Sequence, residues 1–288
     1  MASDEGDRTI STLRHVASVR LERRPKLFAI DIDHTLIRST GELARATIDA
    51  ISLAHARDVE VVLCSSRPPR AMEAYLGELG LWDPAAFVSL QGALTGSYSI
   101  GGGLRVIDRQ PMSLHSALAV TDFASELNIA TNWYSGDRWL VSQIDADVER
   151  ESDIVGFGPE TVDLSSIADA PEKLLLIFPQ PLTSREVAAV NAMSDGIVAQ
   201  QSNTSYLEIT RVGVDKSTAL ARYVKGRNID PADVVAIGDG KNDLGMFAFA
   251  GLGVAPANAT REILAIADFV TESNDADGVA VAIESLVS

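Results

Sequence analysis

Three short apolar runs, each followed at once by polar residues, constrain the fold of this 288-residue chain most strongly. The runs and the residues that follow them are Leu27–Ile30 before Asp31, Val59–Cys64 (interrupted by Glu60) before Ser65, and Val234–Ile237 before Gly238 and Asp239. A weaker run, Leu252–Ala255, precedes Pro256. Short apolar runs of this kind are typical of parallel strands that are buried on both faces of a sheet.

Helical patterns occupy the segments between these runs. They cover Leu43–Ala56, Arg70–Leu79 closed by Gly80, Ser217–Val224 closed by Gly226, Arg261–Ala267, and Val279–Val287. Alternation of strands and helices predicts an α/β fold with a doubly wound parallel sheet. Ligands of such sheets bind beyond the carboxyl ends of the strands, so we expect the polar residues there to form the functional site.

The middle of the chain has a different pattern, which predicts a second α/β module inserted into the first. This region contains strand-like pieces at 139–144, 173–178, 197–200 and 206–209. It also contains one segment with a helical pattern, at 113–127. The predicted organisation is a polar N-terminal extension at 1–25, a core at 26–93 and 210–288, and an inserted module at 94–209.

The composition excludes several classes of function. A net charge of −16 argues against a nucleic-acid partner, because a polyanion would be repelled. The sequence contains no run approaching the ~20 apolar residues that cross a membrane, and the N-terminus lacks the pattern of a signal peptide. Cys64 is the single cysteine, which excludes an internal disulfide and suits a reducing cytoplasm. We therefore expect a cytoplasmic protein that binds neither membrane nor nucleic acid.

Two carboxylates, Asp31 and Asp33, directly follow the first predicted strand. One of them could attack a phosphorus centre while the other carries a proton. The alternative interpretation is a pair of aspartates that cap a turn.

A second acidic cluster, Gly238 to Asp243, follows the third predicted strand. Asp239 and Asp243 offer the hard oxygen ligands that suit Mg²⁺, although an ordinary turn with solvated acids would have a similar composition. Two carboxylates ~4 Å apart repel by about 4 kcal/mol at an effective dielectric of 20. If both acidic clusters share one edge of the sheet, they require a divalent cation.

Two further residues could bind a phosphate group. Ser65 offers a hydroxyl at a strand end, and Lys216 places an ammonium at the start of a helix. Lys216 would supply the local positive charge that an anionic substrate needs in an acidic chain. Taken singly, each of these two residues is more often an ordinary surface residue than a phosphate ligand.

Taken together, these segments resemble the haloacid dehalogenase superfamily of phosphohydrolases. The segments DIDHTL, CSSRP, VDKSTAL and GDGKND resemble its four motifs in content and in order. The closing stretch, with Asn258-Ala259, 269–275 and 277–280, resembles the Cof-type subgroup, subfamily IIB. This resemblance implies a Rossmann-like core with an inserted α/β cap of type C2B, and the cap would choose the substrate.

The resemblance also implies a role for each motif residue. Asp31 would be the nucleophile that forms an aspartyl-phosphate, and Asp33 would be the general acid and base. Mg²⁺ would be held by the Asp31 and Asp239 carboxylates and the Asp33 backbone carbonyl, with Asp243 supporting the metal through water. The remaining phosphate and substrate contacts would come from Ser65, Ser66, Arg67, Lys216, Asn242 and Asn258.

The sequence departs from the usual family pattern at three places. His34 stands where glycine is common, Ser65-Ser66 replaces threonine-glycine, and Gln91 replaces the asparagine that usually precedes Gly92. No departure removes a catalytic group, so the differences bear on specificity.

The expected function is a Mg²⁺-dependent phosphatase that hydrolyses phosphate monoesters of small metabolites, by analogy sugar phosphates. Two alternatives stay open. A phosphomutase or phosphotransferase would pass the phosphoryl group to a second hydroxyl, and a catalytically silent regulator would only bind the metabolite. The sequence does not specify the oligomeric state.

Overall fold

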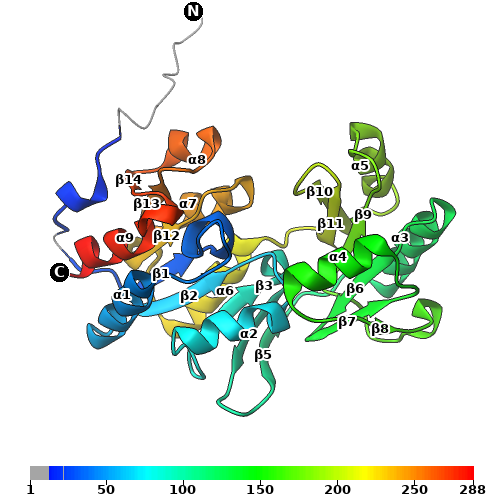
Figure 1. The fold of residues 1–288 in the computed structure, drawn as a ribbon, viewed down its shortest axis with the longest axis horizontal. Helices are drawn as coiled ribbons and strands as arrows, with labels where there is room; N and C mark the ends of the chain where they lie inside the picture. Colours follow the sequence, from blue (N-terminus) through cyan, green and yellow to red (C-terminus); the bar gives the residue numbers. More distant parts are fainter. Residues whose placement is uncertain (1–12, 22) are drawn as a thin grey trace, which may run out of the picture. The chain divides into compact units, whose positions relative to one another are not determined.

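The computed structural model describes residues 13–21 and 23–288. The chain divides into two compact units (Figure 1). The first unit contains the described residues up to Ser65 together with Ala74–Val88 and Asp215–Ser288. The second unit contains Ser66–Glu73 and Ser89–Val214.

The sheet of the first unit has the strand order β14-β13-β12-β1-β2-β3. Its strands are β1 Leu27–Ile30, β2 Glu60–Cys64, β3 Phe87–Ser89, β12 Val234–Ile237, β13 Leu252–Pro256 and β14 Phe269–Thr271. Neighbouring strands in this order pair in parallel. Ile30 lies opposite both Leu63 and Ile237, so the residues that follow β1, β2 and β12 emerge at one edge of the sheet.

Helices cover both faces of this sheet. They are α1 Arg45–Ala56, α6 Lys216–Arg227, α7 Leu244–Phe249, α8 Arg261–Ile266 and α9 Gly278–Val287. Helix α2, Pro69–Glu78, is divided between the two units after Glu73. Side chains of α6, α7 and α8 form an apolar core with alternate residues of the strands, such as Ala29, Val62 and Ala236. The other helix pair, α1 and α9, packs together and contacts β2 and β13. This two-sided packing confirms the predicted Rossmann-like α/β core.

Two predicted element ends were wrong. The pattern placed the end of a helix at Gly226, but α6 continues to Arg227, and Asn228 takes the left-handed conformation at φ 55°. Asparagine tolerates this conformation well enough to replace glycine after a helix. The strand expected to reach Ile144 ends at Val141, because Asp145 caps the next helix and leaves Ile144 exposed.

The second unit contains a six-stranded sheet in the order β10-β11-β9-β6-β7-β8. Its strands are β6 Thr131–Ser135, β7 Arg138–Val141, β8 Glu160–Thr161, β9 Lys173–Ile177, β10 Ile197–Gln201 and β11 Tyr206–Arg211. A hairpin of β4 Leu94–Tyr98 and β5 Leu104–Arg109 also belongs to this unit, with helices α3 Leu114–Glu126, α4 Ala146–Val155 and α5 Ser184–Asn191.

The two faces of this second sheet differ in chemistry, because successive side chains of a strand point to opposite faces. One face carries Trp133, Leu174 and Leu207 and forms an apolar core with α3 and α5. The opposite face carries the apolar Leu175 and Ile177 together with the following side chains at registered positions: Asn132, Tyr134, Lys173, Tyr206, Glu208 and Thr210.

The predicted N-terminal extension is described only in part, since residues 1–12 and 22 lie outside the described residues. His15 forms an isolated bridge with Val270, and Val16 is buried in a short 3₁₀ turn, Val16–Ser18. Cys64 is buried, and burial raises the pKa of its thiol. Among the described residues, no helix combines the length and apolar character that crossing a bilayer would need.

Candidate active site

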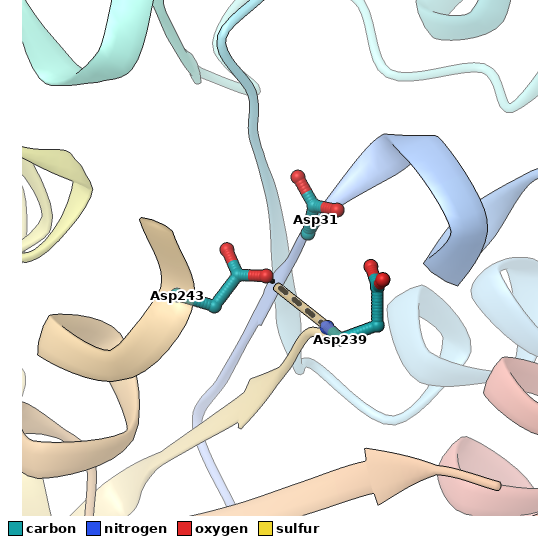
Figure 2. Close-up of side chains that lie close together, drawn as sticks. All are labelled: Asp31, Asp239 and Asp243. Carbon is teal, nitrogen blue, oxygen red and sulfur yellow. Dashed lines mark hydrogen bonds between the residues drawn. The ribbon is translucent and has the colours of Figure 1, made fainter. Parts of the chain in front are cut away.

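Three carboxylates converge at the carboxyl edge of the first unit's sheet (Figure 2). Asp31 directly follows β1, while Asp239 and Asp243 lie in the loop and turn after β12. Each offers an oxygen atom, and these three oxygens lie within 4.8 Å of one another. Asp31 and Asp243 are buried, and Asp239 is partly exposed. The two acidic clusters of the sequence therefore meet in space.

Lys216 connects two of these carboxylates. It is the first residue of α6, and its side chain is fully buried. The Nζ atom donates to Asp31 Oδ1 at 2.5 Å and to Asp243 Oδ1 at 2.7 Å. This arrangement fixes one oxygen of Asp31 and leaves the other free of the lysine.

Asp243 organises the loop in addition to holding Lys216. Its Oδ2 accepts hydrogen bonds from the backbone N–H groups of Asp239, at 3.1 Å, and Gly240, at 3.0 Å. A Cβ added at Gly238 would lie 2.6 Å from Asp243 Oδ2, which requires glycine at this position. Because both oxygens of Asp243 are engaged, its clearest role in this structure is to shape the loop.

The turn that carries Asp33 is held by neighbouring loops. His34 has φ 59°, and Asn258 Nδ2 donates to its carbonyl oxygen at 2.8 Å. Asn258 Oδ1 also accepts from the backbone N–H of Asn274 at 2.9 Å. Asn258 thus links the turn after β1 to the loop that contains Asn274. Asp33 itself is partly exposed.

Sequence reasoning missed two residues of this site, Thr35 and Asn274. Thr35 Oγ1 donates to Asp239 Oδ1 at 2.8 Å, and Asn274 Nδ2 donates to the Ile37 carbonyl at 3.0 Å. Both residues stand inside the quoted motifs. Their residue types alone gave no signal, because threonine and asparagine are common in turns.

The electrostatics of the cluster favour a cation. Burial, reinforced by Asp243 and opposed by Lys216, raises the pKa of Asp31 well above the ordinary value. Burial also raises the pKa of Asp239, although the Thr35 hydrogen bond acts in the opposite direction. Burial alone would lower the pKa of Lys216, but Asp243 and Asp31 raise it, so the ammonium stays charged. One ammonium faces three carboxylates, and this oxygen-rich, negatively charged set fits Mg²⁺.

The remaining predicted site residues lie in different places. Ser65 is buried after β2, and its backbone N–H donates to the Val88 carbonyl at 2.9 Å. Asn242 is exposed on the short turn Lys241–Asp243. Ser66 and Arg67 belong to the second unit, where the Ser66 carbonyl accepts from Lys173 Nζ at 2.8 Å.

Comparison with known proteins gives consistent matches over nearly the whole chain. A model of the family described as haloacid dehalogenase-like hydrolase matches residues 28–283. A putative phosphatase of Bacillus subtilis, YxeH, is 29% identical, and the match covers 91% of this chain and 98% of the relative. The 5-amino-6-(5-phospho-D-ribitylamino)uracil phosphatase YwtE, also from Bacillus subtilis, is 29% identical, with coverage of 91% and 98%.

Solved structures agree with the fold. A haloacid dehalogenase-like hydrolase from Bacteroides thetaiotaomicron superposes with a TM-score of 0.80 at 24% identity, covering 91% of this chain and 99% of that chain.

Proposed function

Because this chain belongs to the haloacid dehalogenase-like hydrolase family, we propose that it is a Mg²⁺-dependent phosphatase acting on phosphate monoesters of small metabolites. The family predicted from the motifs is thereby confirmed, and the curated relatives described above are named as phosphatases. The observation that carries the proposal is the buried Lys216 bridging Asp31 and Asp243 beside Asp239.

Asp31 is the nucleophile of the proposed reaction. One of its oxygens attacks phosphorus, and the bond between phosphorus and the leaving oxygen breaks as Asp33 gives that oxygen a proton. Asp33 then takes a proton from water, whose oxygen attacks the aspartyl-phosphate and releases inorganic phosphate and the free Asp31 carboxylate. Lys216 orients Asp31 throughout, since it holds one of its two oxygens.

Mg²⁺ would be bound by Asp31, Asp239 and the Asp33 backbone carbonyl, with Asp243 nearby, and would offset the negative charge of the phosphoryl group. Ser65 and Lys216 would contact the transferring group, Asn242 and Asn258 would order the loops, and Ser66 and Arg67 would contact the substrate. These assignments follow the motifs and agree with the positive charge that Lys216 adds to an acidic cluster.

The second unit would act as the cap that selects the substrate. Sugar phosphates and related phosphorylated polyols are the proposed substrates, because one relative is named for a ribitylamino phosphate. The proposed location is the cytoplasm, with no membrane or nucleic-acid partner, in agreement with a net charge of −16.

Phosphate release tests this function. The purified protein should release inorganic phosphate from p-nitrophenyl phosphate and from sugar phosphates when Mg²⁺ is present. Excess chelator should abolish release, and renewed Mg²⁺ should restore it. Full activity in chelator would contradict the metal assignment. Transfer of the phosphoryl group to a second sugar without free phosphate would identify the mutase instead.

A further inference from the structure

The turn Ile32–Leu36, called the catalytic turn below because it contains Asp33, has an irregular backbone. Asp33 has the extended angles φ −72° and ψ 129°, and His34 has the left-handed angle φ 59°. A hydrogen bond from the Ile37 N–H to the Ile32 carbonyl, at 3.1 Å, closes the turn. A left-handed conformation at a residue other than glycine is unfavourable and persists only where surrounding contacts hold it.

Two aspartates in the turn after β14 hold the segment Ile37–Ser39, which directly follows the catalytic turn. Asp275 Oδ1 accepts from the Ser39 N–H, and Asp275 Oδ2 accepts from the Ser39 hydroxyl, both at 2.8 Å. Asp277 Oδ1 accepts from Arg38 Nη2 at 2.7 Å. These two residues, called the clamp aspartates below, therefore hold adjacent residues of one segment through both its backbone and its side chains.

The turn that carries the clamp aspartates is itself tightly closed. The Gly278 N–H donates to the Ser273 carbonyl at 3.0 Å, and the Thr271 hydroxyl donates to the Gly278 carbonyl at 2.7 Å. A Cβ added at Gly278 would lie 1.9 Å from the Glu272 carbonyl oxygen, so this close approach requires glycine. The clamp aspartates are thereby fixed to β14 on one side and to α9 on the other.

Stability alone does not account for the clamp contacts, because they lie near the surface. The side chains of Arg38 and Asp277 are 40% and 34% exposed, and Asp275 and Ser39 are exposed. Ion pairs that water can reach contribute little to stability. Catalysis depends far more steeply on position, since a displacement of about 1 Å in a catalytic group can cost about 100-fold in rate.

We propose that Asp275 and Asp277 are positioning residues that hold the catalytic turn, and with it Asp33, in the geometry needed for general acid and base catalysis. The proposal rests on the phosphatase function above and gives a role to the closing stretch of the chain. The clamp aspartates act through the segment Ile37–Ser39. Their effect is largest in the second displacement, when Asp33 must take a proton from the attacking water.

The double variant Asp275→Asn/Asp277→Asn tests this role. Asparagine keeps the size of both side chains and tolerates the φ of 62° at residue 277, so the fold should be retained. With p-nitrophenyl phosphate, hydrolysis of the phosphate on Asp31 should slow by about 10-fold. Intact-protein mass spectrometry after rapid quenching should therefore detect a larger phosphorylated fraction than in wild type. The value of kcat/KM should change by less than about 3-fold, because p-nitrophenolate leaves without a proton.

Two single variants complete the kinetic test. Ser39→Ala removes only the hydroxyl that donates to Asp275, and it should slow the same step by about 2- to 3-fold. Asp49→Asn is the matched control, because it removes an exposed aspartate that pairs with Arg45 at 2.9 Å on α1 of the same unit. This control should retain the wild-type kinetics and the wild-type phosphorylated fraction.

Amide hydrogen exchange tests the clamp without any substrate. The Ile37 N–H donates to the Ile32 carbonyl rather than to a clamp aspartate, so its exchange reports opening of the catalytic turn. Exchange at Ile37 should be several-fold faster in the double variant and unchanged in Asp49→Asn.

Unchanged exchange at Ile37 would overturn the positioning role. A fall in kcat/KM without accumulation of phosphorylated protein would overturn it as well. If wild type released no phosphate from any ester, the phosphatase function would be contradicted instead, and exchange at Ile37 alone would decide whether the clamp aspartates hold the turn.

Discussion

The two units each bury a lysine, and the surroundings of the two side chains differ. Lys216, in the first unit, is 0% exposed and contacts two carboxylates, Asp31 and Asp243, with Asp239 nearby. Lys173, in the second unit, is 4% exposed and contacts one carboxylate and one backbone carbonyl. The first cluster has excess negative charge, and the second is close to neutral. A buried lysine therefore does not by itself indicate a cation site, whereas the excess of carboxylates around Lys216 favours one.

Removing the nucleophile from the first cluster should have the strongest effect on activity. Asp31→Asn should lower turnover by on the order of 10⁴-fold or more, because an amide is a poor nucleophile. Steady-state phosphate release with p-nitrophenyl phosphate measures this loss.

Asp33→Asn supplies the contrast to Asp31→Asn. It keeps the nucleophile and removes the acid and base, so p-nitrophenyl phosphate should still phosphorylate Asp31, and hydrolysis should stall. Intact-protein mass spectrometry after rapid quenching should detect a phosphorylated fraction in Asp33→Asn and none in Asp31→Asn. Near-normal turnover of Asp31→Asn would favour direct attack by a metal-bound water.

Removing each lysine in turn tests the charge difference directly. In metal-free buffer, Lys216→Met should lower the free energy of unfolding by about 3–5 kcal/mol, since it leaves Asp31 and Asp243 buried without their cation. Lys173→Met should lower the free energy of unfolding by only about 1–3 kcal/mol, because Glu208, the partner of Lys173, keeps its hydrogen bond from Gln91. Urea unfolding measures both values.

Added Mg²⁺ extends the same experiment. It should recover part of the loss in Lys216→Met, because the ion can neutralise the carboxylates, and it should recover none in Lys173→Met. Equal losses in the two variants, or equal recovery, would show that carboxylate number does not distinguish the clusters.

The smallest expected effect concerns the pH dependence of stability in the second unit. Burial raises the pKa of Glu151, with the Tyr206 hydrogen bond acting in the opposite direction. Between the ordinary and the raised pKa, the folded protein holds a proton that the unfolded chain has released. Stability therefore falls as pH rises through that window and is constant above it.

Glu151→Gln should remove this contribution, so the variant should gain stability relative to wild type as pH rises from 4 to 7, by about 1.4 kcal/mol per unit of pKa shift. Chemical unfolding of both proteins across this pH range provides the measurement. Because the two proteins share all other buried acids, the contributions of those acids cancel in the difference between the two free energies of unfolding. A constant difference across the range would mean that the Glu151 pKa is not raised.

Much of the first unit follows from local sequence patterns. Apolar runs located β1, β2, β12 and β13, and the polar residue after each run located the edge at which Asp31 and Asp239 meet. These features depend on a few neighbouring residues, so a single sequence contains them. The end of α6 was missed because both glycine and asparagine tolerate the left-handed conformation that follows a helix. The pattern assigned this position to Gly226, whereas Asn228 takes it in the structure.

The second unit was harder to predict from its sequence. Strand β6 and helices α4 and α5 were not anticipated, because their apolar residues are mixed with polar ones along the sequence. Lys173 and Glu208 lie 35 residues apart in the chain, and their contact depends on the antiparallel pairing of β9 with β11, which no local pattern reveals. The role of Thr35 was missed for a similar reason, since its partner Asp239 comes from a distant loop.

The short segment Ser66–Glu73 has a consequence for how this protein can change by recombination. It belongs to the second unit by its contacts, yet it is encoded between two pieces of the first, and the Ser66 carbonyl is bonded to Lys173. A recombination event that exchanged only residues 89–214 between two relatives would place Lys173 and its neighbours from one parent beside Ser66 from the other parent. Functional chimeras should therefore inherit residues 66–73 together with residues 89–214, as two fragments from a single parent.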